Sequence, residues 1–154
     1  MAKARILLLT LMVSMSGCSV ISFNKMTTDV SGVVLLNGQP IEGAEIQFHA
    51  DSAWYGKWKA RAVTTDAQGR FTTPQWRNTR VLVLVHQPVI WQQLIIKYAD
   101  QEYDGWGYTR MTYTDRSDRP SGVFLTCELT SEASVHRLED YRASYGLCVP
   151  ELVD

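Results

Sequence analysis

The carboxylates in the middle of the chain are the first candidates for chemistry, because their spacing imitates a calcium loop. Asp100, Glu102, Asp104 and Gly105 follow the opening of the pattern D-x-[DN]-x-[DN]-G. Calcium requires roughly six to eight oxygens, including a bidentate carboxylate at the twelfth loop position, and that position is Met111. The same residues also alternate as in a strand pair with a turn at Asp100-Gln101. We therefore predict a β-hairpin here and no metal site.

The histidines and hydroxyl residues do not form a recognisable catalytic pattern. His49, His86 and His136 lack the short spacings, such as H-x₃-H or H-E-x-x-H, that zinc sites usually contain. The sequence has no G-x-S-x-G turn for a nucleophilic serine, and no G-x-G-x-x-G or Walker loop for phosphates. Paired carboxylates for glycoside chemistry cannot be read from spacing alone. We expect no catalysis and no cofactor.

The first seventeen residues have the organisation of a signal peptide. Lys3 and Arg5 precede a short apolar run, which small residues follow up to Cys18. The segment Met15-Ser16-Gly17-Cys18 resembles the bacterial lipobox, although Met15 stands where leucine is usual. That resemblance implies cleavage before Cys18 and lipidation of this cysteine, whose acyl chains would anchor the protein at about 0.8 kcal/mol per buried CH₂. Because Ser19 follows, it also implies an outer-membrane location facing the periplasm.

The two cysteines that remain after lipidation are expected to pair. Cys127 and Cys148 have no C-x-x-C partner and no basic neighbour in sequence. Two leftover cysteines in one small domain usually form a disulfide in an oxidising compartment. We therefore predict a structural Cys127–Cys148 bridge; the alternative is a redox-active or nucleophilic thiol.

Hydrophobic patterning predicts mostly strands after a short tether. We divide the chain into a signal peptide (residues 1–17), a tether (18–29) and one domain (30–154). Strands are expected over residues 30–36, 44–49, 57–65, 70–72, 80–86, 91–98, 103–110 and 123–129. Asn37-Gly38 predicts a tight hairpin, and Asp66 to Gly69 a turn. Residues 131–145 carry the only helix signals, so a short C-terminal helical tail is expected.

One part of the domain is similar to a known family. The glycine of the first strand is followed by G-x-P-hydrophobic-x-G-A-x-hydrophobic and then by T-D-x-x-G-x-aromatic. These positions are Gly32, Gly38, Pro40, Ile41, Gly43, Ala44, Ile46, Thr65, Asp66, Gly69 and Phe71. The pattern resembles the carboxypeptidase-regulatory-like, or transthyretin-like, β-sandwich. The resemblance implies an all-β, antiparallel sandwich in which the motif residues build the fold and are not catalytic.

The aromatic residues are the remaining candidates for a binding surface. The chain has five Trp and seven Tyr, and exposed rings serve protein interfaces and sugar stacking alike. Rings that cover the edges of a small core would explain the same residues. Two aromatic clusters and one charged loop are candidate partner-binding residues, namely Trp54, Tyr55 and Trp58, then Trp106 and Tyr108, and finally Arg116 and Arg119.

Charge and composition limit the classes of function. Without Lys3 and Arg5 the mature chain has 13 basic and 16 acidic side chains, a net charge of −3, so no basic excess is available for nucleic acid. We expect a non-catalytic, lipid-anchored periplasmic module that binds another protein, as an accessory subunit of an envelope machine or as a toxin-immunity protein. The alternative is a module that binds glycans or peptides.

Overall fold

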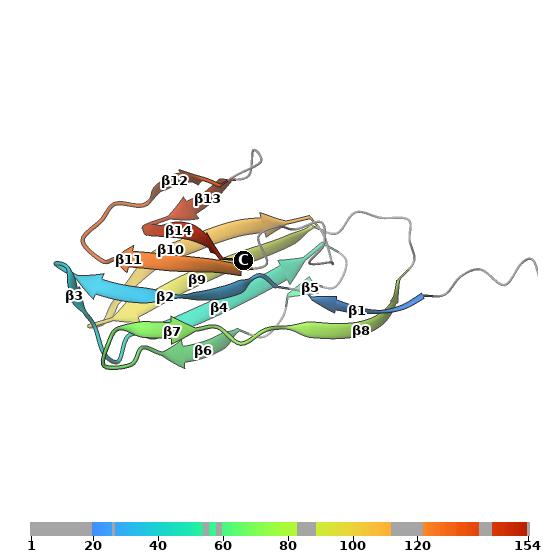
Figure 1. The fold of residues 1–154 in the computed structure, drawn as a ribbon, viewed down its shortest axis with the longest axis horizontal. Coiled ribbons are helices and arrows are strands. Elements are labelled where there is room, and N and C mark those ends of the chain that lie inside the picture. The colour runs from blue at the N-terminus through green and yellow to red at the C-terminus, as the bar shows by residue number, and fades with distance from the viewer. Residues whose placement is uncertain are drawn as a thin grey trace, which may run out of the picture.

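The computed structural model is an all-β molecule in which two sheets face each other (Figure 1). The structure describes residues 20–25, 27–53, 56–57, 60–82, 89–111, 122–138 and 143–153. These residues form fourteen strands and no helix. No described segment is therefore a helix that could cross a membrane. The predicted all-β sandwich is confirmed at this level.

The larger sheet has seven strands among the described residues, in the order β12-β13-β10-β9-β4-β5, with β6 also paired to β4. Its strands are β4 (Glu45–Ser52), β5 (Gly56–Lys57), β6 (Arg61–Thr64), β9 (Ile90–Tyr98), β10 (Gln101–Arg110), β12 (Ser134–Arg137) and β13 (Ala143–Gly146). All its pairings are antiparallel. The β9–β10 hairpin turns at Ala99 and Asp100, whose φ angles are 49° and 60°. The predicted hairpin is therefore confirmed, with its turn one residue earlier than the predicted Asp100-Gln101.

The smaller sheet has five strands among the described residues, in the order β14-β11-β2-β3, with β7 also paired to β2. They are β2 (Asp29–Leu36), β3 (Gln39–Pro40), β7 (Arg70–Thr72), β11 (Gly122–Glu128) and β14 (Cys148–Val153). The central pair, β2 and β11, is parallel, with Leu125 opposite Gly32. The sandwich is therefore not purely antiparallel, because β11 runs in the same direction as β2 when the chain re-enters this sheet.

A two-stranded ribbon extends from one end of the sandwich (Figure 1). β1 (Val20–Lys25) pairs antiparallel with β8 (Arg77–Leu82). At about 3.3 Å per residue, six paired residues span roughly 20 Å. Part of the segment expected to be a tether therefore has strand structure. The end of this segment is held against β9, because the buried Thr28 N–H donates to Gln92 Oε1 at 2.7 Å.

The core lies between the facing sides of the two sheets. Alternate residues of β4 and β9 are buried, and their apolar side chains form one cluster with the buried apolar residues of β2 and β11. The apolar side chains with 1% exposure or less are Val30, Val34, Ala44, Ile46, Phe48, Ile90, Leu94, Ile96, Trp106, Leu125, Cys127 and Cys148. Burial of an aliphatic or aromatic side chain stabilises by about 1.5–3 kcal/mol, so this layer holds the sheets together.

The predicted C-terminal helical tail is wrong. Residues 134–137 and 143–146 form β12 and β13, and β14 follows at Cys148. Val135 and Tyr145 are opposite each other in the β12–β13 pair, and both are exposed. The weak helix signal in this segment is overridden by pairing with the free edge of β10, since tertiary contacts outweigh helix propensity in short segments.

Thr65 and Asp66, the T-D pair of the sequence motif, stabilise the turns at one end of the sandwich by hydrogen bonds. The buried Thr65 Oγ1 donates to Ile41 O at 2.7 Å and accepts from Ala44 N at 2.9 Å. Asp66 accepts from the backbone N–H groups of Gln68 and Arg70 and closes the predicted turn. The T-D pair therefore connects the loop before β4 to the turn before β7.

The Asn37-Gly38 turn forms as predicted, and a carboxylate holds it. Asn37 and Gly38 have φ angles of 52° and 75°, as a two-residue hairpin requires. Their N–H groups donate to Glu128 at 3.0 and 2.8 Å. Hydrogen bonds from Gly38 and then from the Thr130 hydroxyl lower the pKa of Glu128 to about 2. This contribution to stability is present above the ordinary carboxyl pKa and is lost as the pH falls toward 2.

The predicted disulfide is present. Cys127 on β11 and Cys148 on β14 are directly opposite each other and are bonded. Both side chains are completely buried. The bond ties the C-terminal strand to the centre of the smaller sheet.

Candidate functional site

Most of the predicted surface residues lie outside the described part of the chain. This applies to Cys18, Trp54, Tyr55, Trp58, Arg116 and Arg119. The structure does describe residues that flank Trp54 and Tyr55 in sequence. β4 ends at Ser52, and β5 begins at Gly56, which is opposite Ser52. The predictions for these six residues stay predictions.

Trp106, one of the candidate partner-binding residues, lies in the core, in agreement with the alternative that these rings cover the core. Its side chain is 1% exposed, and its ring stacks on Tyr108 with centroids 5.6 Å apart. The reason is an irregularity between Asp104 and Trp106, where β10 carries one residue more than β9. Such a bulge reverses the alternation of side chains beyond it. Trp106 therefore faces inward together with Tyr108, whereas Asp104 faces outward.

Close backbone packing at this bulge depends on glycine. Gly146 of β13 has a φ of 148°, and a Cβ atom added to it would lie 2.2 Å from the carbonyl oxygen of Gly105. A residue with a side chain therefore does not fit at position 146. The contact brings β13 alongside β10 and thereby positions Tyr145.

The outer face of the seven-stranded sheet has a gap in its row of side chains at Gly107. Gly107 of β10 is opposite Gln93 of β9 on one side and opposite Tyr145 of β13 on the other. Val135 of β12 continues the row beyond Tyr145. Because Gly107 has no side chain, its neighbours surround a depression in the sheet surface.

We call this depression the Gly107 hollow, which consists of two adjoining parts of about 430 and 150 Å³. Both parts are lined by Gln93, Gly107 and Tyr145. The larger part is also lined by Trp91 and Val135, and the smaller part by Asp104. Trp91, Tyr145 and Val135 are 49%, 53% and 66% exposed, so large apolar groups surround the hollow and remain open to solvent.

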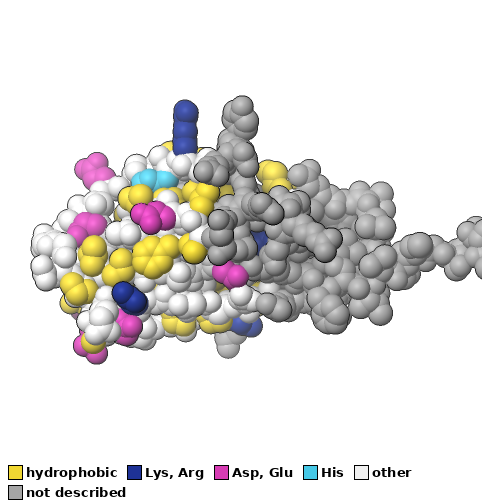
Figure 2. All heavy atoms as spheres, in the orientation of Figure 1, with side chains coloured by type: hydrophobic (Ala, Val, Ile, Leu, Met, Phe, Trp, Pro, Cys, Tyr) yellow, Lys and Arg dark blue, Asp and Glu magenta, His cyan; other side chains and the backbone are white. Residues whose placement is uncertain are grey.

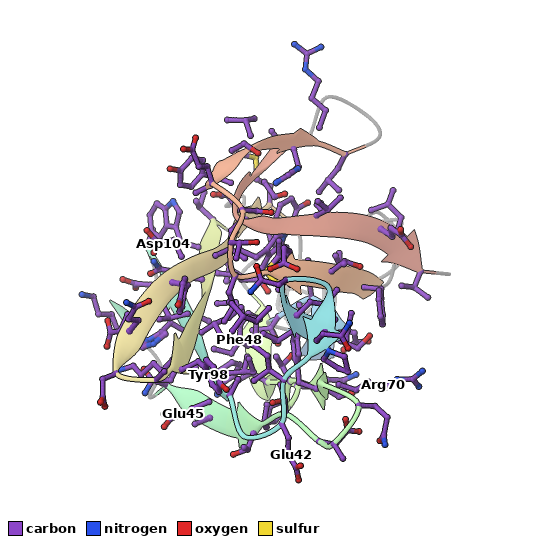
Figure 3. The ribbon with its side chains drawn as sticks, turned by 90° about the vertical axis from the view of Figure 1, so that its left-hand side faces the viewer. Glu42, Glu45, Phe48, Arg70, Tyr98 and Asp104 are labelled. Atoms are coloured by element: carbon purple, nitrogen blue, oxygen red, sulfur yellow. A yellow bond between two sulfur atoms is a disulfide. The ribbon has the colours of Figure 1, made fainter. Side chains whose placement is uncertain are left out.

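Asp104 is the charged residue of the hollow. Among the described lining residues it is the only acid, and none of them is a base. The Gln93 amide donates to Asp104 Oδ1 at 3.4 Å across the two strands. Figure 3 shows Asp104 on the outer side of this sheet, whereas Phe48 points between the sheets.

Between Asp104 and the β9–β10 turn, the two strands also carry an ion pair. Lys97 and Glu102 are opposite each other and form a salt bridge. The hydrogen bond that Lys97 donates to Glu102 is the main reason why the pKa of Lys97 is raised. Lys97 is therefore already paired, and its charge is directed to Glu102.

A second depression of about 310 Å³ borders the hollow at Trp91. It is lined by His49, Asp51, Lys57, Trp91 and Gln93, together with parts of Ala50 and Gln92. It lies where β4, β5 and β9 meet, beside the residues that precede and follow Trp54 and Tyr55. The outer face of the seven-stranded sheet is thus hollowed from β4 to β12.

The smaller sheet offers a different surface. Figure 2 views the molecule from that side, where hydrophobic groups alternate with polar and charged groups. Val149 and Val153 of β14 are 51% and 44% exposed there. Exposed aliphatic residues that occur singly are normal on a protein surface, so we regard the ring-lined hollow as the stronger candidate.

The chemistry that the hollow supports is recognition. Its residues supply aromatic faces, an amide and a carboxylate, which suit stacking, hydrogen bonding and ion pairing. Within the described ranges no group of three or more His, Cys, Asp and Glu residues could hold a metal ion. Trp91 could have been found from sequence. Side chains alternate along β9, so Trp91 lies on the outer face when its neighbour Ile90 is buried on the inner face. Tyr145 could not, because it was assigned to the helical tail.

One family model matches the chain, over residues 30–132. The matched region begins in β2, includes the motif turns, the bulge and Gly107, and ends just beyond β11. No curated protein and no solved structure matches the chain. Since the match covers about two thirds of the sequence, the chain belongs to the family described as Domain of unknown function (DUF6795).

Proposed function

We propose that this protein is a non-catalytic, lipid-anchored module that binds another protein at the periplasmic face of the outer membrane. The observation that carries the proposal is the solvent-exposed, ring-lined hollow on the seven-stranded sheet. Exposed aromatic groups beside polar groups are typical of protein interfaces. Roles as an accessory subunit of an envelope machine and as a toxin-immunity protein both fit such a surface.

In the proposed architecture the module would lie at a distance from the membrane. Lipidated Cys18 would lie two residues before β1, and the β1–β8 ribbon would then separate the lipid from the sandwich. The buried disulfide suits an oxidising compartment. The sandwich of two sheets and the motif turns described above support a transthyretin-like identity for the fold.

The anchor is tested by substitution of its cysteine. We expect wild-type protein to sediment with outer membranes and to partition into detergent, whereas Cys18→Ser protein should lose both properties because it has no thiol to carry the lipid. Intact mass measurement reports the acyl chains directly. A Cys18→Ser protein that stays membrane-bound with the wild-type mass would contradict the lipoprotein assignment.

The binding face is tested by removal of its two exposed rings. We expect a Trp91→Ser, Tyr145→Ser double variant to stay folded but to lose its envelope partner when the tagged protein is purified from cross-linked cells. Aromatic anchors contribute about 2 kcal/mol or more to binding, so affinity for the purified partner should fall about 30-fold.

The matched control removes exposed apolar side chains from the other sheet. Val149→Ser, Val153→Ser protein should retain the partner, since these residues lie on β14. Loss of the partner in the control alone would place the interface on the smaller sheet. Wild-type protein could instead bind purified peptidoglycan or polysaccharide in the absence of any other protein. If the Trp91→Ser, Tyr145→Ser double variant (the ring variant) loses this binding, the alternative of glycan binding is favoured.

A further inference from the structure

We propose that the Gly107 hollow accepts an arginine side chain that the protein partner presents. This inference rests on the proposed protein-binding function and names the chemistry that its central contact recognises. Three features of the hollow support it: the gap at Gly107, the carboxylate of Asp104, which has no basic residue beside it among the described lining residues, and the exposed rings of Trp91 and Tyr145.

The gap gives the hollow room for a long side chain. A Cβ atom at Gly107 would meet the Tyr145 carbonyl at 3.5 Å and Gln92 O at 3.9 Å. A side chain here would thus fit sterically against the backbone. The glycine leaves this space open instead, between Gln93 and Tyr145. A partner side chain can therefore lie on the sheet backbone with Val135 and Tyr145 along its stem.

The charge of the hollow favours a cation. Asp104 is the only charged group among its described lining residues, and its carboxylate accepts a hydrogen bond from the neutral Gln93 amide. The lysine on the same pair of strands, Lys97, is already paired with Glu102. A cation in the hollow would thus meet a carboxylate, and none of the described lining residues is a base that would compete with it.

The rings favour arginine over lysine. A guanidinium group is planar, is less strongly hydrated than an ammonium group, and can stack on a ring while it bonds a carboxylate. The protein already contains such a contact, because Arg61 lies over the Trp76 ring with 4.7 Å between the guanidinium carbon and the ring centroid. The hollow offers the same ring chemistry to a partner, with the carboxylate added.

The test uses short peptides and the full mature domain. We would titrate isotope-labelled protein with acetyl-Gly-Arg-Gly-amide at millimolar concentration and follow the Trp91 indole and Tyr145 signals by NMR. The citrulline peptide is the matched probe, because it keeps the shape of arginine and removes the charge. We expect saturable shifts around Gly107 with the arginine peptide, and binding at least about fivefold weaker with citrulline.

Variants assign the contact to its residues. Asp104→Asn should weaken arginine-peptide binding by about fivefold, and Tyr145→Leu should weaken it similarly. Asp100→Asn is the matched control, because it removes the same charge from the β9–β10 turn outside the hollow and should leave the affinity unchanged. Amide dispersion confirms that each variant is folded.

Two results would overturn the inference. One is equal binding of the arginine and citrulline peptides, and the other is a lack of shifts around Gly107 at millimolar arginine peptide. Shifts produced there by N-acetylglucosamine oligomers and not by arginine would assign the hollow to sugars. If the arginine peptide fails but the ring variant still loses its purified protein partner, this inference is wrong and the proposed function stands.

Discussion

Replacement of Trp106 by alanine is expected to lower the free energy of unfolding by about 3–5 kcal/mol, the range for large aromatic side chains removed from a core. Trp106 is 1% exposed, lies opposite Leu94 and stacks on Tyr108. Its removal would leave a large cavity beside the bulge, where the close contact of Gly105 with Gly146 prevents the strands from collapsing. Urea denaturation followed by circular dichroism measures the effect.

The matched control for this residue is Trp106→Phe. The indole Nε1 of Trp106 is buried and has no hydrogen-bond partner among the described residues. Phenylalanine removes this unsatisfied donor and keeps most of the ring, so we expect a loss of less than about 1.5 kcal/mol. If the alanine variant loses less than the phenylalanine variant, or if it loses partner binding at unchanged stability, Trp106 is an interface residue and our description of the core is wrong.

Removal of the disulfide is expected to cost about 2–4 kcal/mol of stability. The bond closes a loop with a sequence separation of 21, and chain-entropy reasoning gives about 3 kcal/mol for a loop of this size. The Cys127→Ala, Cys148→Ala double variant avoids leaving one buried thiol without a partner. Denaturant midpoints in buffer without reductant compare it with wild type.

Reductant provides the control for the disulfide prediction. Dithiothreitol should lower the stability of wild-type protein toward that of the double variant, and it should leave the double variant unchanged. Because Cys148 follows Tyr145 by three residues, reduction should also loosen the wall of the Gly107 hollow. Two freely alkylated thiols in natively purified protein would contradict the bridge and reopen a redox role for these cysteines.

The sequence predicted the parts of the fold that depend on local chemistry. Asn37-Gly38 forms its hairpin because both residues tolerate positive φ, and Asp66 closes its turn with hydrogen bonds to residues close in sequence. The disulfide could also be predicted, since only two cysteines remain in the expected mature chain. These signals act within a few residues or depend on a simple count, so no knowledge of distant contacts is required.

The candidate site could not be predicted, because it depends on contacts between distant segments. Gly107 and Tyr145 become neighbours only when β13 pairs with β10, and β13 lies where the sequence favoured a helix. Asp104 and Gly107 share the outer face only because of the bulge between them, which shifts the register by one residue without a local signal. The parallel pairing of β2 and β11 likewise arises from strands far apart in the chain.

The most direct test of the proposed binding face is site-specific photo-crosslinking in intact cells. A photoreactive phenylalanine derivative at position 145 keeps an aromatic ring beside the Gly107 hollow, and the same residue at position 149 probes β14 of the smaller sheet. We predict a discrete crosslinked protein from position 145, none from position 149, and loss of the product from position 145 when Asp104→Asn is added. A crosslinked protein from position 149 alone, or from neither position, would contradict the proposed binding face.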